Sequence, residues 1–282
     1  MKLVRFGNPG SEKPGLIDSS GTIRDLSAHV PDFTGEHLAP EALDRLRAID
    51  PSGLPAAPAG VRLGAPVAGT RNFIAIGLNY ADHAKETSQE IPAEPILFNK
   101  APNCIVGPND DIKYPKDARH MDWEVEIAFV VGKRASYVEE KDAPAHIAGY
   151  CLCNDVSERR FQVKHAGQWV KGKSAETFGP LGPWLATPDE IADVQNLAMS
   201  LDVNGERKQT GSTSTMIFSI PFLLAYISRF MVLDPGDVVT TGTPPGVGSA
   251  KKPPEYLKAG DELVLRVEGL GEQRAKVVPF TP

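Results

Sequence analysis

The sequence predicts a β-rich α+β fold in which a small N-terminal α/β module precedes a larger domain. The 282-residue chain contains 26 glycines and 25 prolines, a content that favours short strands and shaped loops over a helix bundle. Its apolar residues fall in short runs between turn signals, and one run is long enough for a strand covered on both faces. With 41% hydrophobic and 23% charged residues, the chain has the composition of a globular protein with a sizeable core.

The N-terminal module is expected to cover residues 1–70, and its elements are short. In order, we predict a strand, a hairpin, a helix that starts at a proline, and a Pro- and Gly-rich linker: residues 3–6, 16–26, 40–49 and 51–60. The larger domain then covers residues 71–282.

The larger domain is predicted to contain mostly strands. Its clearest buried strand is 122–132, and an Asn-Gly pair at 204–205 is typical of a two-residue hairpin turn between strands 197–203 and 206–210. Residues 219–231 read as an amphipathic helix. The remaining predicted strands are 73–77, 150–154, 238–241 and 262–268.

Charge and hydropathy exclude several classes of function. The formal net charge is −6 and no basic run occurs, which argues against nucleic acid and anionic membranes as partners. No segment approaches the roughly 18 apolar residues of a membrane span, and no signal peptide is recognisable, so we expect a cytoplasmic protein. The three cysteines lack the spacing of a disulfide framework and are expected to be buried apolar residues: Cys104, Cys151 and Cys153.

Glu124 and Glu126 lie two positions apart in the predicted strand 122–132. Side chains at positions i and i+2 of a strand point to the same face, so the two carboxylates should lie side by side. If the strand is covered on both faces, a cation is the simplest compensation for burying both charges. Alternatively, the strand emerges at a sheet edge, where water solvates both glutamates.

Asp155 ends a short apolar run and could supply a third carboxylate. Three carboxylates form an all-oxygen site that suits Mg²⁺, and Mn²⁺ or Ca²⁺ would also fit. Alternatively, Asp155 caps a helix or closes an Asx-turn, positions at which aspartate is common.

His83 and Glu86 have the i, i+3 spacing that brings side chains together on a helical turn. A carboxylate beside an imidazole can hold a water molecule and take its proton. Alternatively, both residues are solvated on a surface turn. The surrounding segment 83–96 is polar and contains two prolines, so we expect a mobile lid that closes over the substrate.

Residues 167–174 match the P-loop pattern that ends in Lys173-Ser174. A P-loop needs a buried strand before it and a helix after it, and the sequence predicts neither, so we expect no nucleotide site. Lys173 could still stabilise negative charge on a substrate, or it could be an ordinary solvated lysine. The glycine-rich stretch 240–248 follows a predicted strand and could present backbone N–H groups to an anion, or could simply form a tight turn.

In this order, the motifs resemble those of the fumarylacetoacetate hydrolase family over roughly residues 70–282. The matching segments are Gly77-Leu78-Asn79-Tyr80 with His83 and Glu86, Asp122-Trp123-Glu124-x-Glu126, Asn154-Asp155-Val156-Ser157, Gly172-Lys173-Ser174, and Thr241-Gly242-Thr243-Pro244 with Gly246-Val247-Gly248. The resemblance implies a mixed β-sandwich or roll as the core domain. It also implies a homodimer or a dimer of dimers.

The resemblance also implies a role for each matching residue. Glu124, Glu126 and Asp155 correspond to metal ligands. The residues that match catalytic positions are His83 and Glu86, which activate water, and the active-site lysine, Lys173. Those that match substrate contacts are Arg159, Gln162 and Thr243. Glu158 departs from the pattern, because many relatives have a small residue before the arginine, and it could tune the pocket.

The N-terminal module resembles the subgroup that contains 2,4-diketo-3-deoxy-L-rhamnonate hydrolases. These enzymes act in sugar acid catabolism, where they cleave an acylpyruvate, which is a small-molecule 2-keto acid, to pyruvate and L-lactate. Oxaloacetate decarboxylase and ureidoglycolate lyase are alternatives that use the same kind of site. A β-rich metal- or ligand-binding protein without turnover is the alternative outside enzymes.

Overall fold

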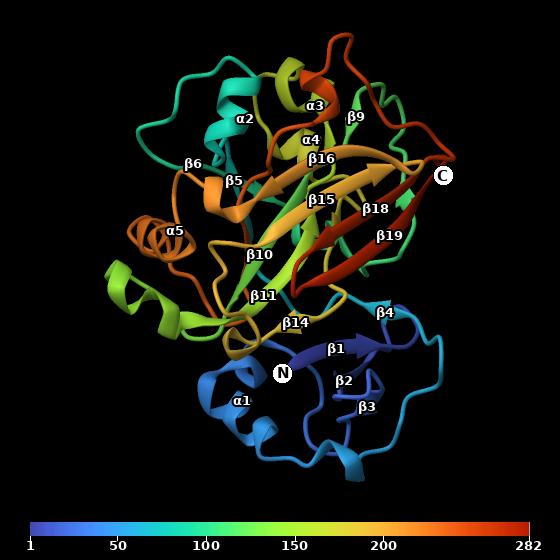
Figure 1. Ribbon diagram of the computed structural model, residues 1–282, viewed down its shortest axis with the longest axis vertical. Coiled ribbons are helices and arrows are strands. Elements are labelled where there is room, and N and C mark those ends of the chain that lie inside the picture. Colours follow the sequence, from blue (N-terminus) through green and yellow to red (C-terminus); the bar gives the residue numbers. More distant parts are fainter. Residues whose placement is uncertain (282) are drawn as a thin grey trace.

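The computed structural model describes residues 1–281 and contains two main β-sheets (Figure 1). The first sheet has ten strands within the described residues, and β4 (Leu63–Gly64) pairs with β1 beside the main path. The order of the other strands is β3 (Ile23–Asp25), β2 (Lys13–Ile17), β1 (Lys2–Phe6), β14 (Leu185–Ala186), β11 (Ile147–Asn154), β10 (Val125–Val131), β17 (Val238–Thr240), β5 (Phe73–Gly77) and β6 (Ile96–Lys100).

The second sheet packs against the first. Its strands, in order, are β16 (Glu206–Ser212), β15 (Ala198–Val203), β18 (Glu262–Val267), β19 (Gly271–Val278) and β8 (Ile112–Lys113). Two short pairs lie outside both sheets: β12 (Ser157–Glu158) with β9 (Met121–Asp122), and β13 (Gly179–Pro180) with β7 (Ile105–Val106).

The core lies between the two sheets. Strands β10 and β11 of the first sheet contact β15, β18 and β19 of the second. Every residue of β10 and β11 is buried, as expected for strands covered on both faces, whereas exposed and buried residues alternate in β19. The carboxyl end of β11 and the amino end of β10 therefore lie deep in the protein.

Five α-helices occur in residues 1–281, namely α1 (Pro40–Arg47), α2 (Ala81–Glu86), α3 (Arg159–Lys164), α4 (Val170–Lys173) and α5 (Ile220–Ile227). Helices α2, α3 and α4 gather at one end of the molecule, opposite the N-terminal segment, which is blue in Figure 1. None of the described helices has the length and apolar character that a membrane crossing requires.

Several sequence predictions match the observed elements. The hairpin of β15 and β16 turns at Asn204 and Gly205, which both have positive φ as a two-residue turn requires. The three cysteines are buried and free. The predicted helix 219–231 ends earlier, at Ile227, and Ser228 follows as its C-cap, with its hydroxyl donating to the carbonyl of Ala225 and accepting the N–H of Val138.

Several strands were not predicted, and the two longest of these are β19 and β6. Strand β19 alternates buried Gln273, Ala275 and Val277 with exposed charged residues, and its low apolar content hides it from a search for hydrophobic runs. Strand β6 is an edge strand of the first sheet. The N-terminal strands continue this same sheet, since Lys2 and Leu3 of β1 pair with Ala186 and Leu185 of β14. A domain boundary at residue 70 stays a prediction.

Candidate active site

A cavity of about 670 Å³ opens between helices α2, α3 and α4, strands β5 and β6, and the loop that follows β17. Its lining includes seven of the nine predicted site residues: His83, Glu124, Glu126, Arg159, Gln162, Lys173 and Thr243. The other two contact members of this set, Glu86 through His83 and Asp155 through Lys173. Folding thus gathers all nine residues from segments up to 160 positions apart, between His83 and Thr243.

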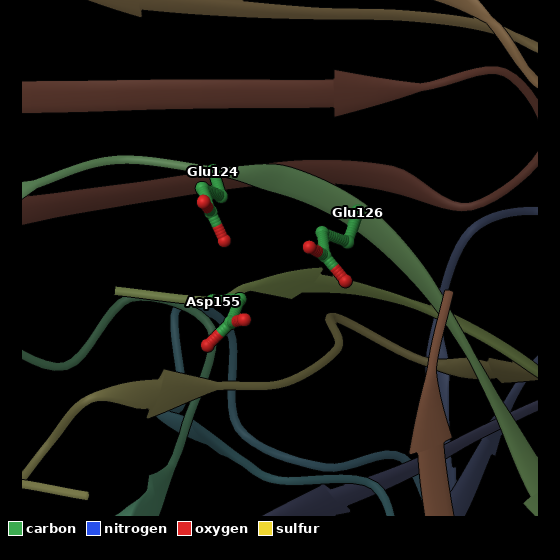
Figure 2. Close-up of side chains that lie close together, drawn as sticks. All are labelled: Glu124, Glu126 and Asp155. Carbon is green, nitrogen blue, oxygen red and sulfur yellow. The ribbon is translucent and has the colours of Figure 1, made fainter. Parts of the chain in front are cut away.

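The carboxylates of Glu124, Glu126 and Asp155 point toward one another (Figure 2). Glu124 directly precedes β10 and Glu126 lies in it, so both side chains leave the same face, as predicted. Asp155 directly follows β11, the antiparallel neighbour of β10. One oxygen from each residue lies within 4.8 Å of the others, and all three residues are buried. This burial rules out a solvated sheet edge for the two glutamates.

Two cations that line the cavity, Lys173 and Arg159, are paired with this cluster. Lys173 Nζ donates to Glu124 Oε2 at 2.7 Å and to Asp155 Oδ2 at 2.6 Å. Arg159 donates from Nη2 to the other oxygen of Glu124 at 2.7 Å and from Nε to Asp122 at 2.8 Å. Burial opposes ionisation of Glu124, but the charges of Lys173 and Arg159 outweigh it and lower the pKa of Glu124 to about 2.

Glu126 differs from the other two carboxylates because no described residue places a cation within salt-bridge distance of it. Its Oε2 accepts hydrogen bonds from the hydroxyl of Thr240 and from the N–H of Gly242 at 2.9 Å. Burial raises the pKa of Glu126 well above its usual value, and the negative charges of Asp155 and Glu124 raise it further. Glu126 is therefore the one carboxylate of the three that no described cation pairs with directly.

These features fit a divalent hard cation. The donors are all carboxylate oxygens, which Mg²⁺, Mn²⁺ and Ca²⁺ prefer. Asp155 Oδ1 is buried and lacks a hydrogen-bond donor among residues 1–281. It does have an ion-pair partner, since Lys100 Nζ lies 2.6 Å away without hydrogen-bond geometry. A divalent cation would also supply the positive charge that Glu126 lacks.

His83 and Glu86 form the pair that their spacing predicts. They lie on helix α2, and His83 Nδ1 is 3.0 Å from Glu86 Oε2. The N–H of Gly246 donates to Glu86 Oε1 at 2.9 Å, which fixes the carboxylate against the loop after β17. Burial tends to raise the pKa of Glu86, but His83 and Gly246 lower it below its usual value, so Glu86 is held as an acceptor.

The three predicted substrate contacts already have protein partners. Arg159 Nη1 donates to Gln162 Oε1 at 3.2 Å, in addition to its two carboxylate partners. The Thr243 hydroxyl donates to the carbonyl of Val125 at 3.0 Å and accepts from Gln209 Nε2 at 2.8 Å. All three residues nevertheless line the cavity, and their contact with substrate stays a prediction.

The glycine-rich loop after β17 does present N–H groups to anions, but these anions are the protein's own carboxylates. Gly242 donates to Glu126, and Gly246 donates to Glu86. Gly248 donates to Asp122 at 2.7 Å. The loop therefore positions the carboxylates of the candidate site.

Residues 167–174 do not form a P-loop. Helix α4 begins inside the motif, at Val170, and the Lys173 ammonium is bound by carboxylates. Glu158, the departure from the family pattern, is buried outside the cavity lining. It accepts hydrogen bonds from the backbone N–H groups of His120 and Phe161, so its role is to cap α3.

Aromatic residues that sequence reasoning missed line the cavity in two stacked or edge-to-face pairs. Phe98 and Trp169 pack edge to face at 5.1 Å, and Lys173 Nζ lies 5.1 Å from the Phe98 ring centroid. His120 and Tyr256, which also line the cavity, stack with ring centroids 4.6 Å apart. They lie in four segments far apart in sequence, and no local pattern points to their meeting.

The model of the fumarylacetoacetate (FAA) hydrolase C-terminal family matches residues 72–278. The chain belongs to this family. A Burkholderia cenocepacia protein named "Putative hydrolase" is 54% identical over 274 residues, with 97% of both chains covered. The fumarylacetoacetate hydrolase of Exiguobacterium antarcticum shares the fold with a TM-score of 0.86 and 35% identity, covering 99% of this chain and 100% of that one.

A third relative has ligands in its structure. The maleylpyruvate hydrolase from Sphingobium sp. SYK-6, in complex with manganese(II) ion and pyruvate, has a TM-score of 0.83 and 27% identity, with both chains fully covered. These likenesses confirm the predicted family and the β-rich α+β fold of this fumarylacetoacetate hydrolase family protein. Both solved structures named here are of hydrolases, and the buried acidic cluster of this chain is a candidate divalent metal site.

Proposed function

We propose that this protein hydrolyses the C–C bond of a 2,4-diketo acid, an acylpyruvate, and releases pyruvate. The observation that carries the proposal is the arrangement of the cavity: His83, which is hydrogen-bonded to Glu86, lines the same space as Glu124 and Glu126 of the carboxylate cluster. The metal ligands would be Glu124, Glu126 and Asp155, and Mg²⁺ is the cation we propose. The fold shared with a manganese- and pyruvate-bound maleylpyruvate hydrolase supports this proposal.

A bound divalent cation would supply Lewis-acid stabilisation of negative charge on the keto acid oxygens. Within the protein, Glu86 takes a proton from a water molecule that His83 helps to orient. The water oxygen bonds to the distal carbonyl carbon, and the C–C bond between that carbon and the pyruvate methylene breaks. The electron pair passes to the pyruvate enolate, which takes a proton at carbon to give pyruvate, while the acyl group leaves as a carboxylic acid.

Lys173 is proposed to stabilise the developing negative charge. Its ammonium lies at the cavity wall, and adjacent Asp155 and Glu124 raise its pKa against the opposing effect of burial. It is therefore a permanent cation that can donate hydrogen bonds to an oxyanion. Gln162 and Thr243 are proposed to line the keto acid site, with Arg159 holding Glu124 in place.

As the specific substrate, we propose 2,4-diketo-3-deoxy-L-rhamnonate, which would yield pyruvate and L-lactate. The support is the likeness of the N-terminal segment to that subgroup. The alternatives are oxaloacetate decarboxylation and ureidoglycolate cleavage, which need no attacking water. We also propose a homodimer or a dimer of dimers.

The test is a substrate panel assayed with Mg²⁺ for release of pyruvate, or of glyoxylate in the case of ureidoglycolate. It contains 2,4-diketo-3-deoxy-L-rhamnonate, simple acylpyruvates, oxaloacetate and ureidoglycolate. We expect acylpyruvates to be cleaved and the Glu86→Gln variant to lose about 10²–10⁴-fold in kcat, the usual contribution of a general base. Turnover of oxaloacetate alone, with Glu86→Gln fully active, would identify a decarboxylase and refute hydrolysis.

A further inference from the structure

Lys100 is a buried cation to which the mechanism assigns no role. It is the last residue of β6, the residue is 1% exposed, and it is absent from the cavity lining. A buried ammonium costs several kcal/mol unless ion pairs and hydrogen bonds replace its hydration. The partners of Lys100 therefore indicate what its burial achieves.

All the described polar partners of the Lys100 ammonium belong to the candidate site or adjoin it. Nζ lies 2.6 Å from Asp155 Oδ1. It donates to the backbone carbonyl of Lys173, at the end of α4, and is 3.4 Å from the carbonyl of Val156. The adjoining backbone makes a further link, because the N–H of Ala101 donates to the hydroxyl of Ser174 at 2.8 Å.

The two lysines of the site thus divide Asp155 between them. Lys173 holds Oδ2 and reaches the cavity, whereas Lys100 holds Oδ1 from behind and cannot touch a substrate. If Lys173 turns toward a substrate oxyanion, Lys100 still balances the charge of Asp155. Lys100 also fixes the backbone from which the Lys173 side chain extends.

We infer that Lys100 is a positioning residue that holds Asp155 and the Lys173 backbone in the geometry that binds the metal. This inference rests on the proposed function, since it takes Asp155 to be a ligand. Partners that orient a metal ligand from behind typically contribute about 10–100-fold to metal affinity or activity.

The experiment compares Lys100→Met, which keeps the length of the side chain and removes its charge, with Lys113→Met. Lys113 is half exposed and paired with Glu176 outside the cavity, which makes it the control. Mn²⁺ is titrated into each metal-free protein by calorimetry. We expect the Kd for Mn²⁺ to rise about 10–100-fold in Lys100→Met and to stay at the wild-type value in Lys113→Met. At saturating Mn²⁺, kcat should fall more than KM changes, because Lys100 does not line the cavity.

Each outcome has a distinct meaning. A Lys100→Met protein with a lower Tm but wild-type Mn²⁺ affinity and kcat would show a structural role alone and overturn the inference, and tighter Mn²⁺ binding would also overturn it. Wild-type protein that binds no Mn²⁺ would refute the proposed function instead. If Lys100→Met does not fold, a crystal structure of the wild-type protein with Mn²⁺ and oxalate decides. Lys100 Nζ should remain beside Asp155, and its separation from Asp155 would overturn the inference.

Discussion

Glu126→Gln should abolish metal binding without destabilising the metal-free protein. Glu126 is buried without a partner cation, and the hydroxyl of Thr240 and the N–H of Gly242 can donate to an amide oxygen as they do to a carboxylate. Removing an unbalanced buried charge stabilises the folded state, and this gain offsets the weaker hydrogen bonds that an amide accepts. The free energy of unfolding should therefore stay within about 1 kcal/mol of wild type or increase.

Asp155→Asn is the matched comparison, because it removes a second proposed ligand that does have cation partners. The change withdraws a carboxylate from both Lys100 and Lys173. Breaking a buried ion pair from one side costs about 3–5 kcal/mol. At about 2.1 cal/mol/K of unfolding entropy per residue, a chain of 282 residues should then lose about 5–8 °C in Tm.

Differential scanning calorimetry with and without Mn²⁺ tests both variants. At an Mn²⁺ concentration 100-fold above Kd, the wild-type protein should gain about 2.7 kcal/mol, or about 4–5 °C in Tm by the same entropy. Neither variant should show this gain. A metal-free Glu126→Gln protein that loses as much stability as Asp155→Asn would refute the charge reasoning, and so would a Glu126→Gln protein that keeps the Mn²⁺-induced gain.

Three further predictions concern the cavity, the segment above it and the thiols. Lys173→Met should bind Mn²⁺ at least as tightly as wild type in calorimetry, because a competing cation is gone. Its kcat should fall about 10²–10³-fold, because a donor that stabilises developing charge is lost. If Mn²⁺ affinity falls together with kcat, Lys173 has a structural role. Hydrogen exchange across residues 83–96, whose stretch 88–91 is exposed, should slow when Mn²⁺ and oxalate bind, and unchanged exchange with oxalate bound would exclude a lid. The three cysteine thiols should resist labelling by a disulfide reagent at pH 8 in the native state, because burial raises their pKa, that of Cys151 to about 12. Rapid labelling of the folded protein would contradict this prediction.

The predictable part of the site is local in sequence. The positions of Glu124 and Glu126 follow from strand periodicity, and their apolar neighbours indicate burial. The pairing of His83 with Glu86 follows from helix periodicity. In each case two chemically suited side chains are separated by one period of a single element, so that forming the element brings them together.

The unpredictable part depends on which elements become neighbours. Lys100 ends an apolar strand, where a lysine ordinarily reaches solvent, and its burial makes sense only once Asp155 and Lys173 arrive from β11 and α4. Likewise, β1 pairs with β14 across more than 180 residues, which no local pattern in either strand specifies. Such contacts are set by the order of strands in the sheet and not by periodicity.

The charges of the site can be counted once these neighbours are known. With Asp122 added to the three clustered carboxylates, the site combines four carboxylates with three cations, and so carries one formal negative charge: Asp122, Glu124, Glu126 and Asp155 with Lys100, Arg159 and Lys173. A divalent cation would change this net charge to one positive, which complements the single carboxylate of a keto acid. The metal-free cluster instead repels that carboxylate. Pyruvate should therefore give binding heat in calorimetry only after Mn²⁺ is added. If pyruvate binds the metal-free protein with similar affinity, the charge of the site does not require the metal to bind before the keto acid.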